Sequence, residues 1–346
     1  GGGLPDAWLG GTGYSPHPLP RQNVTPLDVP KASCAKGGVS RSRSCLARCG
    51  EQQPGIGGTL SRNETNARPR LVVCADDYAL TPGVSRAIRE LLAMGRISAT
   101  SVMTVCPYWP DEAPALREMA GNADIGLHFT LTDHSPLGSM PEFAPSGRFP
   151  TMPQLYKASH GRKLPLDEIR AELERQHERF VSIYGAEPSH IDGHHHVQQL
   201  PGIRDLVIDR AAVIRPHPPW LRSGQEHPGL IIRRRVAPAK ACVLSALGRG
   251  IRRRATKAGL STNDGFSGAY DYDGEKRPFA ELCTRFLIGS RDNALMMCHP
   301  GYSDATLAAL DAMTDARDRE HAFLIADDWP ALIAAYGLER RPLRPD

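Results

Sequence analysis

From residue 70 onward, short apolar runs alternate with amphipathic stretches, and this alternation constrains the fold more than any other feature of the sequence. Short apolar runs of this kind are typical of strands that are covered on both faces. Strands that alternate with helices form βαβ units and a largely parallel sheet, and about seven such units close into a barrel. The sequence therefore predicts an α/β barrel. The predicted strands are residues 71–75, 99–105, 123–127, 188–192, 212–215 and 294–298.

For the helix predicted after the first strand, the sequence contains signals for both the start and the end. Thr81 is a candidate N-cap, Pro82 suits the first helical turn, and Gly95 is a C-terminal stop. Further helices are predicted over residues 111–120, 167–184, 202–211 and 277–288. Residues 216–276 have no clear period, and the proline-rich stretch 130–165 is predicted to be a loop that covers a substrate.

Residues 1–68 differ from the rest, because they are rich in Gly, Pro, Ser, Asn and Arg and lack any sustained period. Such a segment buries too little apolar surface to offset its ordering entropy, so we expect a disordered extension followed by one domain over residues 69–338. The eight cysteines are scattered without CxxC pairs and no secretory signal is visible, so we expect reduced thiols and a cytoplasmic location.

The overall composition argues against two classes of partner. The net charge of +4 is too small to favour nucleic acid, and no aromatic residues are interleaved with basic ones as a base-stacking surface requires. No apolar run approaches the roughly 20 residues of a transmembrane helix. The basic segment 233–257 is interpreted as a solvated helix face. The alternative is that it contacts a phosphorylated or lipid-linked substrate or an anionic membrane.

Polar clusters follow the predicted strands at the point where each strand ends. They are Asp76-Asp77, His128, the run from His190 to His196, and His299. Because the carboxyl ends of parallel strands share one face, these clusters should converge. Each has a structural alternative: a helix-capping turn for the aspartates, a buried histidine for His128, a metal-scavenging surface tract for the run, and the start of a turn for His299.

Histidines and carboxylates in this arrangement are typical of a hydrolytic metal site. Two neutral imidazoles and one carboxylate, with a position left for water, commonly bind Zn²⁺. A second carboxylate takes the proton of the water, and an acid protonates the leaving group. Asp76 and Asp77 are adjacent, so their side chains cannot play the same role. On an extended backbone, Asp192, His194 and His196 would share one side and His195 the other.

At this point the sequence resembles a known family, the YdjC/ChbG-like carbohydrate deacetylases, over about residues 70–335. The resemblance rests on short motifs that occur in this order: Cys74-Ala-Asp-Asp-Tyr-Ala79, Thr100-Ser-Val-Met103, Gly126-Leu-His-Phe-Thr-Leu-Thr132, Pro188-Ser-His-Ile-Asp-Gly-His-His-His-Val197, Phe266-Ser-Gly-Ala-Tyr-Asp271 and Met297-Cys-His-Pro-Gly-Tyr302. It implies a distorted (β/α) barrel, one divalent metal ion, and hydrolysis of the N-acetyl group of an amino sugar or short N-acetylated oligosaccharide.

The resemblance also implies roles for individual residues. Asp77, His128 and His194 would bind the metal, Asp76 would be the general base, and His299 the general acid. His196 is a reserve metal ligand. Two departures from the family pattern are Ala79, where a glycine is usual, and Gln198, where a further histidine is frequent. Arg215, which follows a predicted strand, and Tyr302 are candidates for substrate contact.

The prediction is thus a metal-dependent deacetylase of carbohydrates, with Zn²⁺ or Mg²⁺ as the ion and a homodimer as a further expectation. The main alternative is a non-catalytic sugar- or metal-binding protein on the same scaffold, suggested by Ala79 and Gln198. A third is a phosphoesterase, although that chemistry usually favours two metals and more carboxylates.

Overall fold

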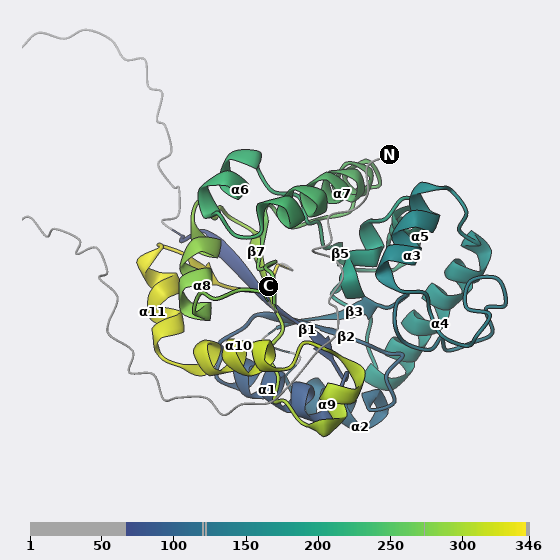
Figure 1. Ribbon diagram of the computed structural model, residues 1–346, viewed down its shortest axis with the longest axis horizontal. Coiled ribbons are helices and arrows are strands. Elements are labelled where there is room, and N and C mark those ends of the chain that lie inside the picture. The colour runs from purple at the N-terminus through teal and green to yellow at the C-terminus, as the bar shows by residue number, and fades with distance from the viewer. Residues whose placement is uncertain (1–66, 120, 122, 273, 344–346) are drawn as a thin grey trace, which may run out of the picture. The chain divides into compact units, whose positions relative to one another are not determined.

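Seven parallel strands form the centre of the molecule. The computed structural model describes residues 67–119, 121, 123–272 and 274–343. The strand order is β5-β4-β3-β2-β1-β7-β6, and the short strand β8 pairs with β1 outside this path. All neighbours on the path are parallel, and the sheet curls into a half-barrel with helices around its outside (Figure 1). The predicted α/β fold with a distorted barrel is confirmed.

The strands are β1 (Arg70–Tyr78), β2 (Ala99–Val102), β3 (Asp124–Phe129), β4 (His190–Gly193), β5 (Trp220–Leu221), β6 (Phe266–Ser267), β7 (Ala294–Cys298) and β8 (Glu339–Arg340). The helices are α1 (Pro82–Ala93), α2 (Trp109–Arg117), α3 (Met152–His160), α4 (Leu166–Tyr184), the 3₁₀ helix η2 (His194–Gln199), α5 (Ile203–Val213), α6 (Pro228–Arg234), α7 (Pro238–Lys257), α8 (Phe279–Leu287), α9 (Ala305–Leu310), α10 (Asp315–Ile325) and α11 (Asp328–Ala335).

Strand β1 lies in the middle of the sheet, and this position explains its sequence. It pairs with β2 on one side and β7 on the other, and every residue from Leu71 to Tyr78 is buried. A strand covered on both faces favours apolar side chains on both, so residues 71–75 form a continuous apolar run instead of an alternating one, and the buried Asp76 and Asp77 follow it. The helix α1 follows as predicted, with Val84 N donating to the Thr81 hydroxyl at 3.2 Å.

Three parts of the chain differ from the sequence-based expectation. The stretch 130–165 was predicted to be a loop but contains the helix α3. The strand predicted at residues 212–215 is wrong, because α5 continues to Val213 and the next strand is Trp220–Leu221. A four-residue apolar run does not distinguish a buried strand from the last turn of a helix. The unassigned residues 216–276 contain β5, α6, α7 and β6, two of which are strands of only two residues.

The gap between the edge strands β5 and β6 is spanned by one buried side chain. Leu221 forms an isolated parallel bridge with Thr262, just before β6. The neighbouring Asn263 accepts from Ser223 N at 2.8 Å and donates to the carbonyls of Ser223 and Gly265 at 2.9 and 2.8 Å. Asn263 is fully buried, so these bonds join the two edges of the half-barrel without solvent competition.

The described residues test the expectations on the cysteines and on the N-terminal extension only in part. The described cysteines, Cys74, Cys106, Cys242, Cys283 and Cys298, are free thiols, whereas Cys34, Cys45 and Cys49 lie outside the described residues. The extension predicted over residues 1–68 lies almost wholly outside them as well. Among the helices of residues 67–343, none has the length and apolar character needed to cross a bilayer.

Candidate active site

The two adjacent aspartates at the end of β1 have different neighbours. Asp77 has a φ of 70° and Ala79 a φ of 72°, so the chain turns sharply where the strand ends. Asp77 lies near His128 and His194, whereas Asp76 lies near Arg222 and His299. Such φ values are strained for non-glycine residues, and strain of this kind is common at functional sites.

Three of the predicted ligands meet at the carboxyl ends of β1, β3 and β4. Asp77 Oδ1 lies 3.2 Å from His128 Nε2 and 3.1 Å from His194 Nδ1, and ligand atoms of all three residues lie within 4.8 Å of one another. One carboxylate and two imidazoles form a donor set suited to a divalent ion.

Two other groups of acidic, histidine or cysteine side chains are as close together, but the positively charged side chain of Arg222 already bonds to members of both. They are Cys74, His190 and Asp192, and Asp76, His128 and Asp192. The Arg222 guanidinium lies 2.9 Å from Cys74 Sγ, 2.5 Å from Asp192 Oδ2 and 2.6 Å from Asp76 Oδ2. Arg222 thus bonds to both oxygens of Asp76 and to Asp192 Oδ2, whereas Arg317 bonds only to Asp77 Oδ2 and leaves Oδ1 facing the two histidines. The set Asp77, His128 and His194 therefore fits a metal best among the described residues.

The Nδ1 atom of His128 faces away from Asp77 and toward another carboxylate. Nδ1 lies 2.7 Å from Asp192 Oδ1 and 3.0 Å from the Ser101 hydroxyl. A carboxylate on the second ring nitrogen of a ligating histidine fixes the tautomer and leaves Nε2 available for a metal. Burial lowers the pKa of His128, but Asp192 and Asp77 more than offset this effect and raise it to about 10, so that without a metal the ring is protonated at pH 7 and a bound metal would displace the Nε2 proton.

The second oxygen of Asp77 is held by an arginine from the C-terminal part of the chain. Arg317, on α10, is fully buried, and its Nη2 donates to Asp77 Oδ2 and Asp311 Oδ2 at 2.6 Å each. Burial raises the pKa of Asp77, but Arg317 and the two histidines outweigh burial and hold it well below its usual value. Asp77 therefore stays ionised, as a metal ligand must be.

Asp76 is clamped by a second buried arginine. Nη1 and Nη2 of Arg222 donate to Asp76 Oδ2 and Oδ1 at 2.6 Å each, and Ser101 Oγ lies 3.4 Å from Oδ1. This bidentate geometry fixes the plane of the carboxylate. Asp76 remains 2% exposed, and its Oδ2 lies 3.9 Å from His299 Nε2.

His299 follows β7 and is held at both its main chain and its ring. Its backbone N–H donates to Glu320 Oε2 at 2.5 Å, and its Nδ1 lies 3.2 Å from the Tyr272 hydroxyl. Burial lowers the pKa of His299 to about 4 in spite of the nearby aspartates, so the ring is neutral at pH 7. Burial also raises the pKa of Glu320 to about 7.

The histidine run is not extended, which corrects the expectation that Asp192, His194 and His196 share one side. The strand ends at Gly193, and the turn η2 places His195 and His196 at φ 54° and 60°. His194 reaches Asp77, whereas His196 is buried with its ring edge-on to Phe266 at 5.5 Å. The reserve ligand His196 thus belongs to none of the candidate metal groups among the described residues.

The two candidates for substrate contact lie elsewhere. Arg215 was expected to follow a strand, but it precedes β5, and its Nη1 donates to the carbonyls of Ala212 and Ile214. Tyr302 donates its hydroxyl to Glu90 at 2.5 Å, and its ring packs against Arg86 and His321. Neither side chain has a hydrogen bond or ion pair with Asp76, Asp77 or His299 within the described part of the chain.

Both residues that depart from the family pattern are accommodated. Ala79 adopts the left-handed conformation that a glycine would adopt freely, and its N–H donates to Ser85 Oγ at 3.1 Å. Gln198 is buried and its Nε2 donates to the Arg222 carbonyl at 3.3 Å. Gln198 therefore supports the main chain of the arginine that clamps Asp76.

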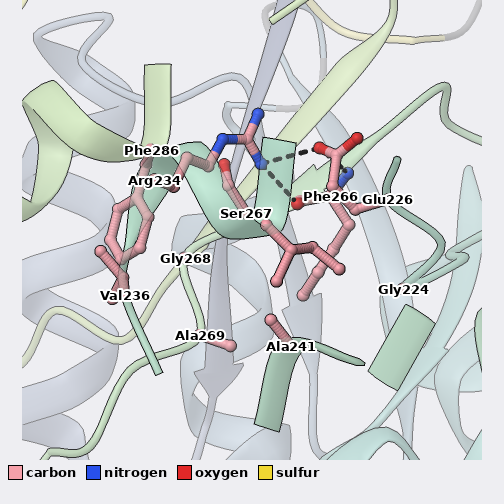
Figure 2. A pocket seen from close by; sticks show the side chains of 11 residues that line it. Gly224, Glu226, Arg234, Val236, Ala241, Phe266, Ser267, Gly268, Ala269 and Phe286 are labelled. Atoms are coloured by element: carbon pink, nitrogen blue, oxygen red, sulfur yellow. Dashed lines mark hydrogen bonds and ion pairs between the residues drawn. The ribbon is translucent and has the colours of Figure 1, made fainter. Parts of the chain in front are cut away.

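A small cavity lies between α6, α7 and β6, apart from the candidate residues (Figure 2). Its volume is about 30 Å³, and its rim includes Phe266 and Ala269. The ion pair between Arg234 Nη1 and Glu226 Oε2, at 2.7 Å, also borders it (Figure 2). A space of this size holds one or two water molecules, so it does not accommodate a sugar.

Comparison with known proteins identifies the family of this chain. The model of the YdjC-like protein family matches residues 70–335. A chitooligosaccharide deacetylase from Serratia marcescens is 32% identical over 241 residues, which cover 68% of this chain and 83% of that protein. Another from Klebsiella pneumoniae (strain 342) is 30% identical over 256 residues, covering 71% and 91%.

The solved structures with a similar fold include one that covers most of both chains. It is a protein of Enterococcus faecalis V583, described as a candidate cellobiose-phosphate cleavage protein, with a TM-score of 0.60 and 21% identity. The match covers 80% of this chain and 98% of that one, and at this identity it concerns the fold alone. The family match spans the whole barrel and every residue of the candidate site, and the chain therefore belongs to the YdjC-like family.

Proposed function

We propose that this protein is a metal-dependent carbohydrate deacetylase that hydrolyses the N-acetyl group of an amino sugar or a short chitooligosaccharide. The observation that carries the proposal is the juxtaposition of Asp77, His128 and His194 with a separate carboxylate, Asp76, and a separate imidazole, His299. The names of the relatives from S. marcescens and K. pneumoniae support the substrate class.

Asp77, His128 and His194 would hold one divalent ion, Zn²⁺ or Mg²⁺. When bound, such an ion supplies a Lewis acid for the acyl carbonyl and lowers the pKa of water. Two imidazoles and one carboxylate favour Zn²⁺, whereas Mg²⁺ prefers oxygen ligands and would depend on Asp77 and on water.

Asp76 is proposed as the general base. Its carboxylate is fixed by Arg222 and lies close to, but does not belong to, the group of metal ligands. It would take the proton of the attacking water and pass it to His299, whose Nε2 is 3.9 Å away. His299 would then protonate the leaving nitrogen, so that water and the amide yield acetate and the free amine.

The proposal is tested by measuring acetate release from N-acetylglucosamine, chitobiose and longer chitooligosaccharides. The enzyme is assayed after chelation and after reconstitution with Zn²⁺ or Mg²⁺ separately. We expect release that depends on the added metal. We also expect Asp76→Asn to bind the same amount of metal and to lose activity by about 10²–10⁴-fold, since it cannot accept the proton.

Two outcomes would contradict the proposal. Full activity of Asp76→Asn would remove the assigned base. Stoichiometric binding of metal and sugar, with no acetate released from any substrate, would instead support a non-catalytic binding protein. Asp315→Asn is the matched control. It also replaces an aspartate by asparagine, but at an exposed position in the first turn of α10.

A further inference from the structure

His299 is oriented by a neutral partner. In a histidine that transfers protons, the nitrogen away from the substrate usually bonds to a carboxylate, which sets the tautomer and stabilises the imidazolium. Here the group facing His299 Nδ1 is the Tyr272 hydroxyl, at 3.2 Å, with the two rings nearly perpendicular at 88°. The nearby carboxylate of Glu320 bonds to the backbone N–H of His299 instead.

Tyr272 is itself fixed in place. Its ring lies 4.3 Å from that of Tyr270, and Lys240 Nζ is 4.8 Å from the ring centroid. Tyr270 in turn donates its hydroxyl to Glu320 at 2.7 Å. The segment after β6 and the helix α10 therefore hold His299 from two directions, through its ring and through its main chain.

The direction of proton transfer determines which tautomer is useful. Nε2 is the ring nitrogen that faces Asp76, so it must carry a lone pair when the proton arrives. A neutral imidazole with a lone pair on Nε2 has its proton on Nδ1. Nδ1–H then needs an acceptor, and the Tyr272 oxygen is in the position to accept it.

A phenol differs from a carboxylate in its effect on the proton. It accepts the hydrogen bond without adding negative charge, so it orients the ring but stabilises the imidazolium little. Burial raises the pKa of Tyr272 well above its usual value, which keeps the hydroxyl neutral. A proton that reaches His299 is therefore not retained there, and it moves on to the leaving nitrogen.

We propose that Tyr272 is the positioning residue of His299, whose hydroxyl accepts the Nδ1 proton and so keeps Nε2 free for proton transfer. This inference rests on the proposed function, in which His299 is the acid. Tyr272 is not assigned a contact with the reacting atoms.

The test is Tyr272→Phe in the metal-loaded enzyme, which keeps the ring and its packing and removes only the hydroxyl. We expect kcat for N-acetylated substrate to fall about 10- to 100-fold with KM unchanged. In a His299→Gln background, Tyr272→Phe should have less than about a twofold effect, because the two residues act as one unit. Tyr336→Phe is the matched control, since it removes a hydroxyl that donates to Thr284 O, outside the site.

A second measurement does not depend on the variant folding. The ¹⁵N NMR spectrum of the His299 ring in the metal-loaded wild-type enzyme should show the proton on Nδ1, and a proton on Nε2 would overturn the inference. An unchanged kcat in Tyr272→Phe, or a full additional loss in the His299→Gln background, would overturn it too. Absence of acetate release by the wild type would instead refute the proposed function, while the NMR result would still report on the tautomer.

Discussion

At the scale of single residues, two buried arginines keep the paired aspartates apart in function. Arg222 and Arg317 are both fully buried, and each bonds to a different one of the two carboxylates. Buried charges are tolerated only when they are paired and hydrogen-bonded. The site thus carries its own charge compensation, independent of any metal at Asp77.

The stability of the fold should depend strongly on Arg222. Arg222→Met would leave the buried carboxylates of Asp76 and Asp192 without their cation, and we expect a loss of about 3–5 kcal/mol in the free energy of unfolding. Urea denaturation measures this loss. Arg252→Met is the control, because its partner Asp264 is half exposed, and we expect a change below about 1 kcal/mol. Equal losses in both variants would contradict the importance of burial.

At the scale of elements, the barrel is completed by irregular segments. The edge strands β5 and β6 have only two residues each, so few ladder hydrogen bonds are available there. Asn263 supplies two bonds across the gap instead, both to Ser223. Because Arg222 directly follows β5, this connection also positions the clamp on Asp76.

Removal of the Asn263 side chain should loosen this edge locally. Asn263→Ala loses two buried hydrogen bonds and one partly buried one and leaves Ser223 N without its bond to Asn263, so we expect a cost of about 2–4 kcal/mol. Hydrogen exchange followed by mass spectrometry should become faster in residues 220–224 and 261–267. Gln154→Ala, which removes a capping contact at α3, serves as the control. The role in closure is refuted if exchange in the two segments stays at the wild-type rate.

At the scale of the whole molecule, several buried histidines make stability depend on pH. Burial lowers the pKa of His134 to about 4, that of His196 to about 3 and that of His299 to about 4. Below pH 6.5 these side chains take up protons in the unfolded chain but not in the folded one. Their contribution is therefore lost as the pH falls from 6.5 toward 4.

Glu320 opposes this trend, because its raised pKa of about 7 lets the folded state bind a proton first on acidification. Three histidines outweigh one carboxyl, so the chelated protein should lose on the order of 3–5 kcal/mol of stability between pH 6.5 and 4.5. Chemical denaturation at several pH values measures the loss. His134→Gln should flatten the decline, with the exposed His217→Gln as control. Rising stability on acidification would contradict this balance.

The sequence by itself determined the parallel barrel and most of the polar clusters. Residues Leu71–Ala75 of β1 and the whole of β7 are buried on both faces and therefore form continuous apolar runs, which is a local signal. The convergence of Asp77, His128 and His194 followed from one topological rule, since parallel strands end at the same edge. Arg222 also follows a strand directly, so the same rule could have identified it as a candidate site residue. The strand β5 has only two residues, however, and so short a strand cannot be recognised from the sequence.

Only the tertiary structure decided which side chains complete the site. Arg317 lies on a helix 240 positions away from Asp77 and has no local feature that predicts its partner. His196 shares the run with His194, yet a turn with positive φ separates them, and backbone conformations of that kind depend on the surrounding packing. Tyr272 likewise meets His299 because β6 and β7 are neighbours in the sheet. Periodicity reports burial and local conformation, whereas contacts between distant segments depend on how the whole chain packs.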